Sequence, residues 1–146
     1  MELLRLAVVC CLILIFVTFP FETKGYEGLK KCKVQNVKNA YTYSKTVFVG
    51  EVLRVTEENG VKTFTFRVGK NWKGAKSKEI QVNVQETMHY QAWFKVREKY
   101  LVYASGSDTD ENSEKLWERR CSRTKRLSDA SEDMKELGEA KKSVKK

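Results

Sequence analysis

Two cysteines, Cys32 and Cys121, lie at the two ends of a run of short alternating segments and constrain the fold more than any other feature. The chain has four cysteines, and the other two, Cys10 and Cys11, lie inside an apolar leader. Once the leader is removed, the remaining pair allows one disulfide within the chain. We therefore expect a secreted, compact, β-rich domain with a Cys32–Cys121 disulfide. Closing so long a loop contributes about 4–5 kcal/mol in the chain-entropy model.

The leader is residues 1–25. Arg5 precedes an apolar run, residues 6–19, which matches the length of a signal-peptide core and is short for a membrane span of roughly 20 residues. Thr23 and Gly25 place small residues at positions −3 and −1 of a cut after Gly25. The sequence thus predicts secretion, a domain over residues 26–138, a basic tail over 139–146 and no membrane span after cleavage. The alternative is an uncleaved anchor.

Apolar residues at every second position predict five strands. The first, residues 47–55, contains Gly50, which indicates a bulge or bend. Asn59 and Gly60 form a strong hairpin signal, because both central positions of a type I′ turn need positive φ. The other expected strands are residues 63–68, 80–85, 100–104 and 116–120.

Two helical segments flank these strands. Residues 37–44 predict a short N-terminal helix. A C-terminal helix is expected to be capped by Ser128 and to end at Gly138, with Ala130, Met134 and Leu137 on one face. The pattern therefore favours a mainly β protein: a small five-stranded Greek-key barrel of the OB type with a C-terminal and a short N-terminal helix. A plain antiparallel α+β sheet is the alternative.

Several short segments occur in the order found in a known module. They are residues 47–52, 66–68, 72–74, 100–104 and 121–124, followed by Leu127, Ala130, Asp133, Leu137 and Gly138. This set resembles the netrin-like (NTR) module, and within it the tissue inhibitor of metalloproteinases (TIMP) family, closest to its compact single-domain type. The resemblance covers roughly residues 32–138. It implies an OB-type barrel flanked by helices, which agrees with the strand pattern.

The sequence departs from that family at its inhibitory end. Inhibitory members start with Cys-x-Cys, and the amine and carbonyl of the first cysteine chelate the protease zinc. The second cysteine would be Cys32, but the first falls at Lys30, and the expected partner cysteine near residues 88–92 is missing. A cut after Gly25 also leaves six residues before Cys32. A chelating terminus therefore requires further trimming to Cys32.

The net charge of +9 favours anionic partners, and five cations are concentrated within residues 119–126. Such a group could bind sulfates through charge-assisted hydrogen bonds, and some NTR modules bind heparin. The alternative is that Arg123 is structural and the others are solvated. The candidate anion- or heparin-binding residues are Arg119, Arg120, Arg123, Lys125 and Arg126.

A second candidate surface is an aromatic segment between strands. Its residues are Met88, His89, Tyr90, Trp93 and Phe94. Aromatic side chains provide contact area in interfaces, so this segment is a candidate recognition loop. The alternative is that the loop folds its aromatics onto the barrel. The single histidine excludes multi-histidine metal sites, and we expect no catalytic residue, metal or cofactor.

These observations predict a secreted, non-enzymatic NTR/TIMP-like domain that binds an extracellular protein or an anionic glycan. One alternative is inhibition of a metalloproteinase or another protease, and a second is a venom or secretory-gland toxin on the same scaffold. Nucleic acid is not an expected partner, because the aromatic residues of the strands suit a core better than a stacking surface. We expect a monomer.

Overall fold

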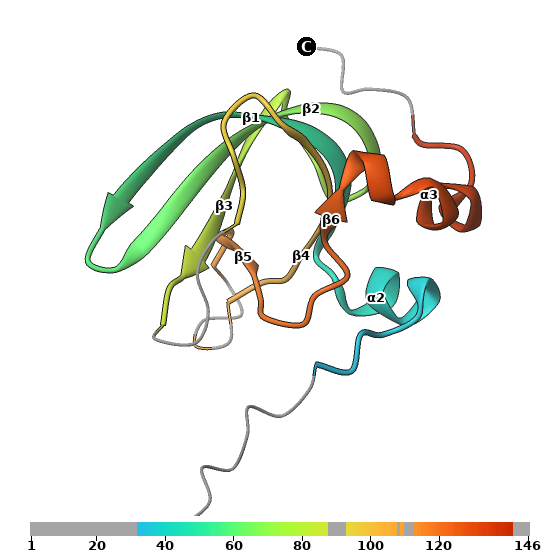
Figure 1. Ribbon diagram of the computed structural model, residues 1–146, viewed down its shortest axis with the longest axis horizontal. Helices are drawn as coiled ribbons and strands as arrows, with labels where there is room; N and C mark the ends of the chain where they lie inside the picture. The colour runs from blue at the N-terminus through green and yellow to red at the C-terminus, as the bar shows by residue number, and fades with distance from the viewer. Residues whose placement is uncertain (1–31, 88–92, 108, 110–112, 142–146) are drawn as a thin grey trace, which may run out of the picture. The chain divides into compact units, whose positions relative to one another are not determined.

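The computed structural model describes residues 32–87, 93–107, 109 and 113–141 (Figure 1). Residues 1–31, 88–92, 108, 110–112 and 142–146, among them Met88, His89 and Tyr90, lie outside this range. The elements in chain order are α2 (Val37–Tyr43), β1 (Thr46–Glu58), β2 (Val61–Lys73), β3 (Glu79–Gln85), β4 (Lys99–Ala104), β5 (Leu116–Glu118), β6 (Lys125–Arg126), the 3₁₀ turn η1 (Leu127–Asp129) and α3 (Ser131–Leu137).

The strands form one six-stranded, curled, half-barrel sheet, so the mainly β prediction is confirmed (Figure 1). The strand order is β5-β3-β2-β1-β4-β6, with β3 and β5 parallel and the other pairs antiparallel. An isolated bridge joins Trp117 of β5 to Ser105, the residue that follows β4. Residues near the two ends of the strand order therefore meet, and the sheet curls round its own apolar face.

The expected number of five strands is wrong, because a sixth strand, β6, pairs with β4 through Tyr100↔Arg126 and Leu101↔Lys125. A strand of two residues shows no alternation in the sequence, so its pattern gives no signal. β5 is also shorter than residues 116–120, and it ends at Glu118.

The β1–β2 hairpin turn is confirmed. Asn59 has φ 49° and Gly60 has φ 74°, the two positive values that a type I′ turn requires. Glu58 pairs with Val61 directly across the turn. The hairpin thus fixes the register from which the long β1–β2 ladder starts.

A bulge lies beside Gly50, as expected, but its extra residue is on the partner strand. Val49 pairs with Lys70 and Gly50 with Val68, which leaves Gly69 of β2 without a partner in this ladder. A Cβ at Gly50 would lie 2.8 Å from the Phe48 ring. Glycine therefore allows the Phe48 ring to fold back over the strand as β1 bends.

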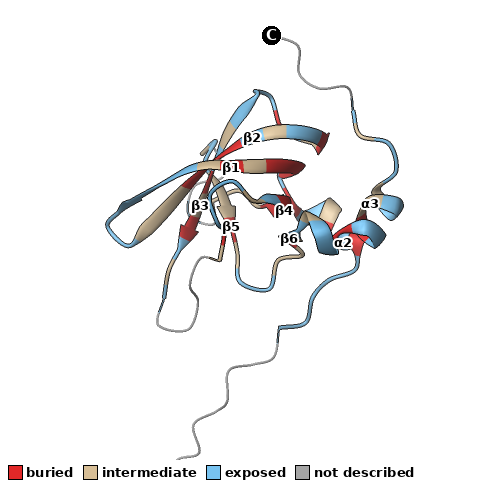
Figure 2. Ribbon diagram, turned by 45° about the horizontal axis from the view of Figure 1, so that its top comes forward, coloured by how far each residue is buried: buried red, intermediate tan, exposed pale blue. Residues whose placement is uncertain are grey.

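Apolar side chains cover both faces of the first half of β1, which is buried in Figure 2. The inner face carries Phe48 and Val52, which belong to a cluster with Phe66 and other residues inside the curl. The outer face carries Val47 and Val49, which belong to a second cluster that α3 residues cover. The helices therefore seal the outer face of the sheet.

The predicted N-terminal helix is confirmed as α2, and Asn36 caps it by accepting a hydrogen bond from the Asn39 N–H at 2.8 Å. The expected Ser128 cap is wrong. The chain enters α3 through η1, which moves the N-cap to Ala130, and the Ser128 hydroxyl donates to the Asp129 carboxylate instead. The Gly138 stop is confirmed, since Gly138 has φ 69° and its N–H donates to Met134 O.

The chain after α3 returns to the sheet. The Lys141 N–H donates to the Asn71 carbonyl oxygen at 2.7 Å, and Trp72 Nε1 donates to Gly138 O at 2.9 Å. The first residues of the predicted basic tail are thus held against β2. Within the part of the chain that is described, no helix is long and apolar enough to cross a membrane.

Candidate functional site

The expected disulfide between Cys32 and Cys121 is confirmed, with a Cα–Cα distance of 5.1 Å. Cys121 has φ 69° in the turn between β5 and β6. The bond holds the segment before α2 against this turn, which we call the disulfide loop (residues 119–124). Three of the five predicted basic residues lie in this loop, and the other two, Lys125 and Arg126, follow it directly.

Asp133 of α3 is a buried charge centre beneath the disulfide loop. Its carboxylate accepts two hydrogen bonds from the Arg123 guanidinium, at 2.6 and 3.0 Å, and one from Lys125 Nζ at 2.7 Å. Tyr103 of β4 donates its hydroxyl to the same carboxylate at 3.2 Å. Asp133 is fully buried, so its negative charge is neutralised by two cations rather than by water.

These contacts decide the ionisation of the cluster. Burial alone would raise the pKa of Asp133, but hydrogen bonds and positive charge from Arg123 and Lys125 outweigh it and lower that pKa. Burial and the neighbouring Asp133 carboxylate raise the pKa of the Tyr103 hydroxyl well above its usual value. At physiological pH, Asp133 is therefore ionised and paired with its two cations, and the Tyr103 hydroxyl is neutral.

The five predicted anion-binding residues thus have different environments. Arg123 and Lys125 are bonded to Asp133, and Arg126 is paired with Glu98 at 3.3 Å. Arg119 Nη2 donates to the Gly106 carbonyl at 3.0 Å, while Arg120 is exposed. The five residues are neighbours in the sequence, but they do not form one surface.

Three of them nevertheless line one compact hollow of about 220 Å³ beside the disulfide. We call it the cationic pocket. Its charged lining residues are Lys33, Arg119, Arg120 and Arg123, and no carboxylate is among the described residues that line it. Lys33 was not predicted for this site. It reaches the pocket because the disulfide fixes the neighbouring Cys32 there.

Glu118 lies at the start of the same loop and is 5% exposed. Its Oε1 accepts a hydrogen bond from the Ser122 hydroxyl at 2.6 Å, while its Oε2 is buried without a hydrogen-bond partner among the described residues. Burial raises the pKa of the Glu118 carboxyl to about 7, although the Ser122 hydrogen bond opposes the rise. The alternation of apolar residues along β5 did not predict that the Glu118 carboxyl would be buried.

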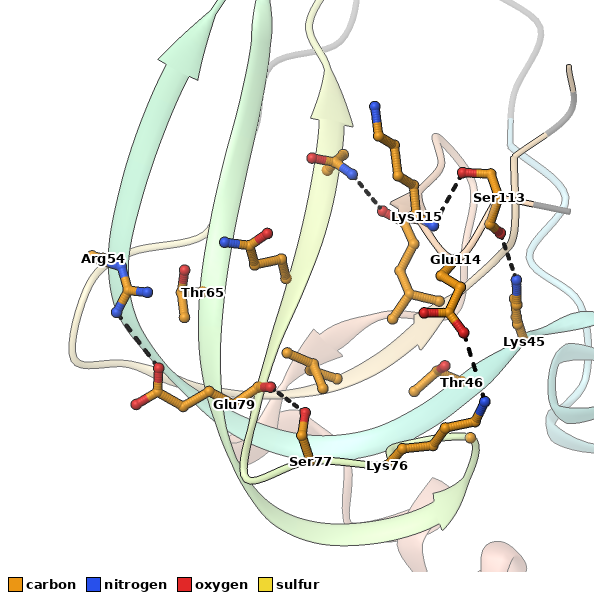
Figure 3. Close-up of a pocket in the computed structure, with 15 residues that line it drawn as sticks. Lys45, Thr46, Arg54, Thr65, Lys76, Ser77, Glu79, Ser113, Glu114 and Lys115 are labelled. Atoms are coloured by element: carbon orange, nitrogen blue, oxygen red, sulfur yellow. Dashed lines mark hydrogen bonds and ion pairs between the residues drawn. The ribbon is translucent and has the colours of Figure 1, made fainter. Parts of the chain in front are cut away.

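A larger hollow, of about 780 Å³, opens where β3 and the segment before β5 diverge (Figure 3). We call it the groove. Lys45 donates from Nζ to the Ser113 carbonyl at 2.7 Å, and Asn83 donates to the Leu116 carbonyl at 3.1 Å. Among the described residues, the rim has four cations and two carboxylates. The charged rim residues are Lys45, Arg54, Lys76, Lys115, Glu79 and Glu114.

The candidate recognition loop is only partly within the described residues. Met88, His89 and Tyr90 lie outside them. Phe94 is 7% exposed and packs edge-on against Phe64, Phe66 and Tyr100, and Trp93 packs against Phe94. These two aromatics therefore fold onto the sheet, as the alternative interpretation expected, and recognition by the remaining three stays a prediction.

Within the described residues, no group of three or more metal-ligating side chains gathers. In comparisons with known proteins, no family model matches the chain and no curated protein matches it. The cationic pocket and the groove each combine a hollow with several charged side chains.

Proposed function

We propose that this protein is a secreted, non-enzymatic binding module that binds an anionic, sulfated glycan through the cationic pocket. The observation that carries the proposal is the lining of that pocket: four cationic side chains and no carboxylate among the described residues around it. Of the five cations predicted near Cys121, three line this pocket, and Lys33 is the fourth cation there.

The pocket suits an anion of sulfate size. A hollow of about 220 Å³ accommodates one sulfate with the adjoining part of a sugar ring. Lys33 and Arg120 are exposed, so their charge can reach a ligand without first breaking a buried ion pair. Hydrogen bonds between a charged donor and a charged acceptor are about twice as strong as neutral ones. Arg123 is held by Asp133, so it contributes mainly positive potential.

We also propose that the curled sheet is an OB-type barrel. The parallel β3–β5 pair and the Ser105–Trp117 bridge support this, because together they connect the five longer strands in a ring. The added β6 strand is an extension of that ring at β4. Membership of the NTR/TIMP-like group stays a proposal that rests on the sequence segments and on the Cys32–Cys121 disulfide.

The test is heparin affinity of a charge-removed variant. Lys33→Gln with Arg120→Gln should weaken binding at least about tenfold, because two charge-assisted hydrogen bonds are replaced by weaker neutral ones. The matched control is Lys38→Gln with Lys135→Gln, two exposed lysines on α2 and α3 that change the net charge equally. Equal losses in the two variants would mean that only net charge attracts heparin, and the pocket would be rejected.

A second candidate function, metalloproteinase inhibition, has one observation in its favour. Cys32 is exposed and anchored by its disulfide to Cys121, which is the rigid anchoring that a chelating first cysteine needs. Mass spectrometry of the secreted protein decides whether that residue is the first. A mature start at Cys32 would support inhibition, and a start at Tyr26 or any residue before Cys32 would exclude this mechanism.

A further inference from the structure

The groove contains an open strand edge. The Val68 N–H donates to Lys78 O, and the Glu86 N–H donates to Gly60 O. Along β3, the backbone N–H and C=O groups of the even-numbered residues therefore point toward β2. The backbone N–H of Gln81 therefore points away from β2. On that side the pairing with β5 begins only at Val82↔Leu116, so no described strand covers the Gln81 N–H. Gln81 lines the groove at this point.

The floor beside this edge is apolar. Ile80 and Leu116 both line the groove, and both pack against the inner apolar cluster while remaining partly exposed. A side chain that covered them would extend the core outward. The groove therefore offers a backbone donor and an aliphatic surface side by side.

The rim is positively charged, and its ion pairs are weak. Lys76 and Glu114 are 3.9 Å apart with side chains 88% and 92% exposed, and Arg54 and Glu79 are 3.6 Å apart and half exposed. Such exposed pairs contribute little, so carboxylates of a ligand can replace them. Lys45, a third cation of the rim, donates to the Ser113 backbone carbonyl.

From these three observations we propose that the groove binds an extended, acidic segment of a partner protein, which adds to the sheet at the β3 edge. A backbone carbonyl of the segment accepts from the Gln81 N–H, an apolar side chain covers Ile80 and Leu116, and flanking Asp or Glu side chains meet Lys76 and Lys115. Strand addition obtains affinity from backbone hydrogen bonds and specificity from alternate side chains. This inference uses none of the residues of the cationic pocket.

A peptide fits the groove better than a glycan does. An aliphatic floor gains free energy only from an apolar group, and sugars are usually stacked on aromatic rings, of which there is none among the described residues that line the groove. An extended chain also places its side chains alternately on the two sides of the strand. One side then meets the floor while the other meets the charged rim.

The probe is a fluorescein-labelled decapeptide of alternating glutamate and valine, and the readout is fluorescence anisotropy with the disulfide-bonded protein. Saturable binding is expected, with Lys76→Glu and Lys115→Glu together weakening it at least about tenfold. Lys38→Glu with Lys135→Glu changes the net charge equally and should weaken binding less than about twofold. Equal effects would overturn the proposal in favour of general charge attraction.

The backbone contact has its own test. Gln81→Pro removes the edge N–H without removing a β2 hydrogen bond and should weaken binding, whereas Gln81→Ala keeps the N–H and should not. If Gln81→Pro does not fold, an amide chemical-shift change at Gln81 on peptide titration replaces it. No shift there, or binding of a heparin octasaccharide that depends on Lys76 and Lys115 while the peptide fails to bind, would overturn the proposal.

Discussion

Two buried carboxylates, Asp133 and Glu118, flank Cys121 along the chain and have opposite surroundings. Asp133 is bonded to two cations and a tyrosine hydroxyl, and its pKa is lowered. Among the described residues, Glu118 has one hydrogen-bond partner, the Ser122 hydroxyl, and one oxygen without a partner, and its pKa is raised to about 7. The difference shows that burial does not decide the charge of a carboxyl; the number of donors that surround it does.

The two carboxylates therefore change stability with pH in opposite directions. The folded-state pKa of Asp133 is lowered, so its contribution is present above its unfolded-state pKa and is lost as pH falls through the folded value. The folded-state pKa of Glu118 is raised, so the folded state binds more protons than the unfolded state between pH 4.5 and about 7. Stability from this group falls as pH rises across that window.

The largest expected change in the free energy of unfolding comes from removing the charge of Asp133. Asp133→Asn leaves Arg123 and Lys125 partly buried without a carboxylate, and should lower the free energy of unfolding by about 3–5 kcal/mol at pH 7. Urea unfolding measures the change. Glu132→Gln, at the exposed neighbouring position, removes the same charge and should cost less than about 0.5 kcal/mol. A similar small loss for Asp133→Asn would show that Asp133 is not a charge centre.

Glu118→Gln should change the free energy of unfolding in the opposite direction. Keeping a carboxyl with a pKa of about 7 ionised at pH 8 destabilises the fold, and removing the ionisation should raise the free energy of unfolding by about 3 kcal/mol at that pH. At pH 4.5 and below the gain should vanish. Glu114→Gln is the matched control, because Glu114 is exposed on the same segment. An equal gain at both pH values would contradict the raised pKa.

The β1–β2 turn, the longer strands and the disulfide could be predicted from the sequence, because each depends on few residues. The β1–β2 turn depends on two adjacent residues that accept positive φ, and the strands depend on alternation along a few positions. The Cys32–Cys121 pairing needed only a count of the cysteines that lie outside the expected leader. None of these features requires knowledge of which distant segments meet.

The candidate sites could be predicted only in part, because they depend on distant contacts. The basic residues at 119–126 are visible in the sequence, but the bonding of Arg123 and Lys125 to Asp133 follows from the docking of α3. Lys33 enters the pocket only through the disulfide. The groove exists because β5 stops pairing with β3 at Val82, and no residue type marks that position.

The smallest effect concerns Ser122, whose hydroxyl donates the hydrogen bond that Glu118 Oε1 accepts. Ser122→Ala removes a hydrogen bond that lowers the pKa of Glu118, so that pKa should rise further above about 7. The free energy of unfolding should then fall by about 1 kcal/mol at pH 8, where the carboxylate most needs a donor, and by less at pH 5. Urea unfolding at the two pH values measures the difference.

The double variant, Ser122→Ala with Glu118→Gln, separates the two contributions of the serine. When position 118 carries the amide, the pH dependence of the Ser122 effect should disappear, because no titrating group remains there. A loss that remains and is independent of pH is the contribution of the Thr124 N–H, which donates to the Ser122 hydroxyl at 3.1 Å. A pH dependence that persists would contradict the assignment to the Glu118 carboxyl.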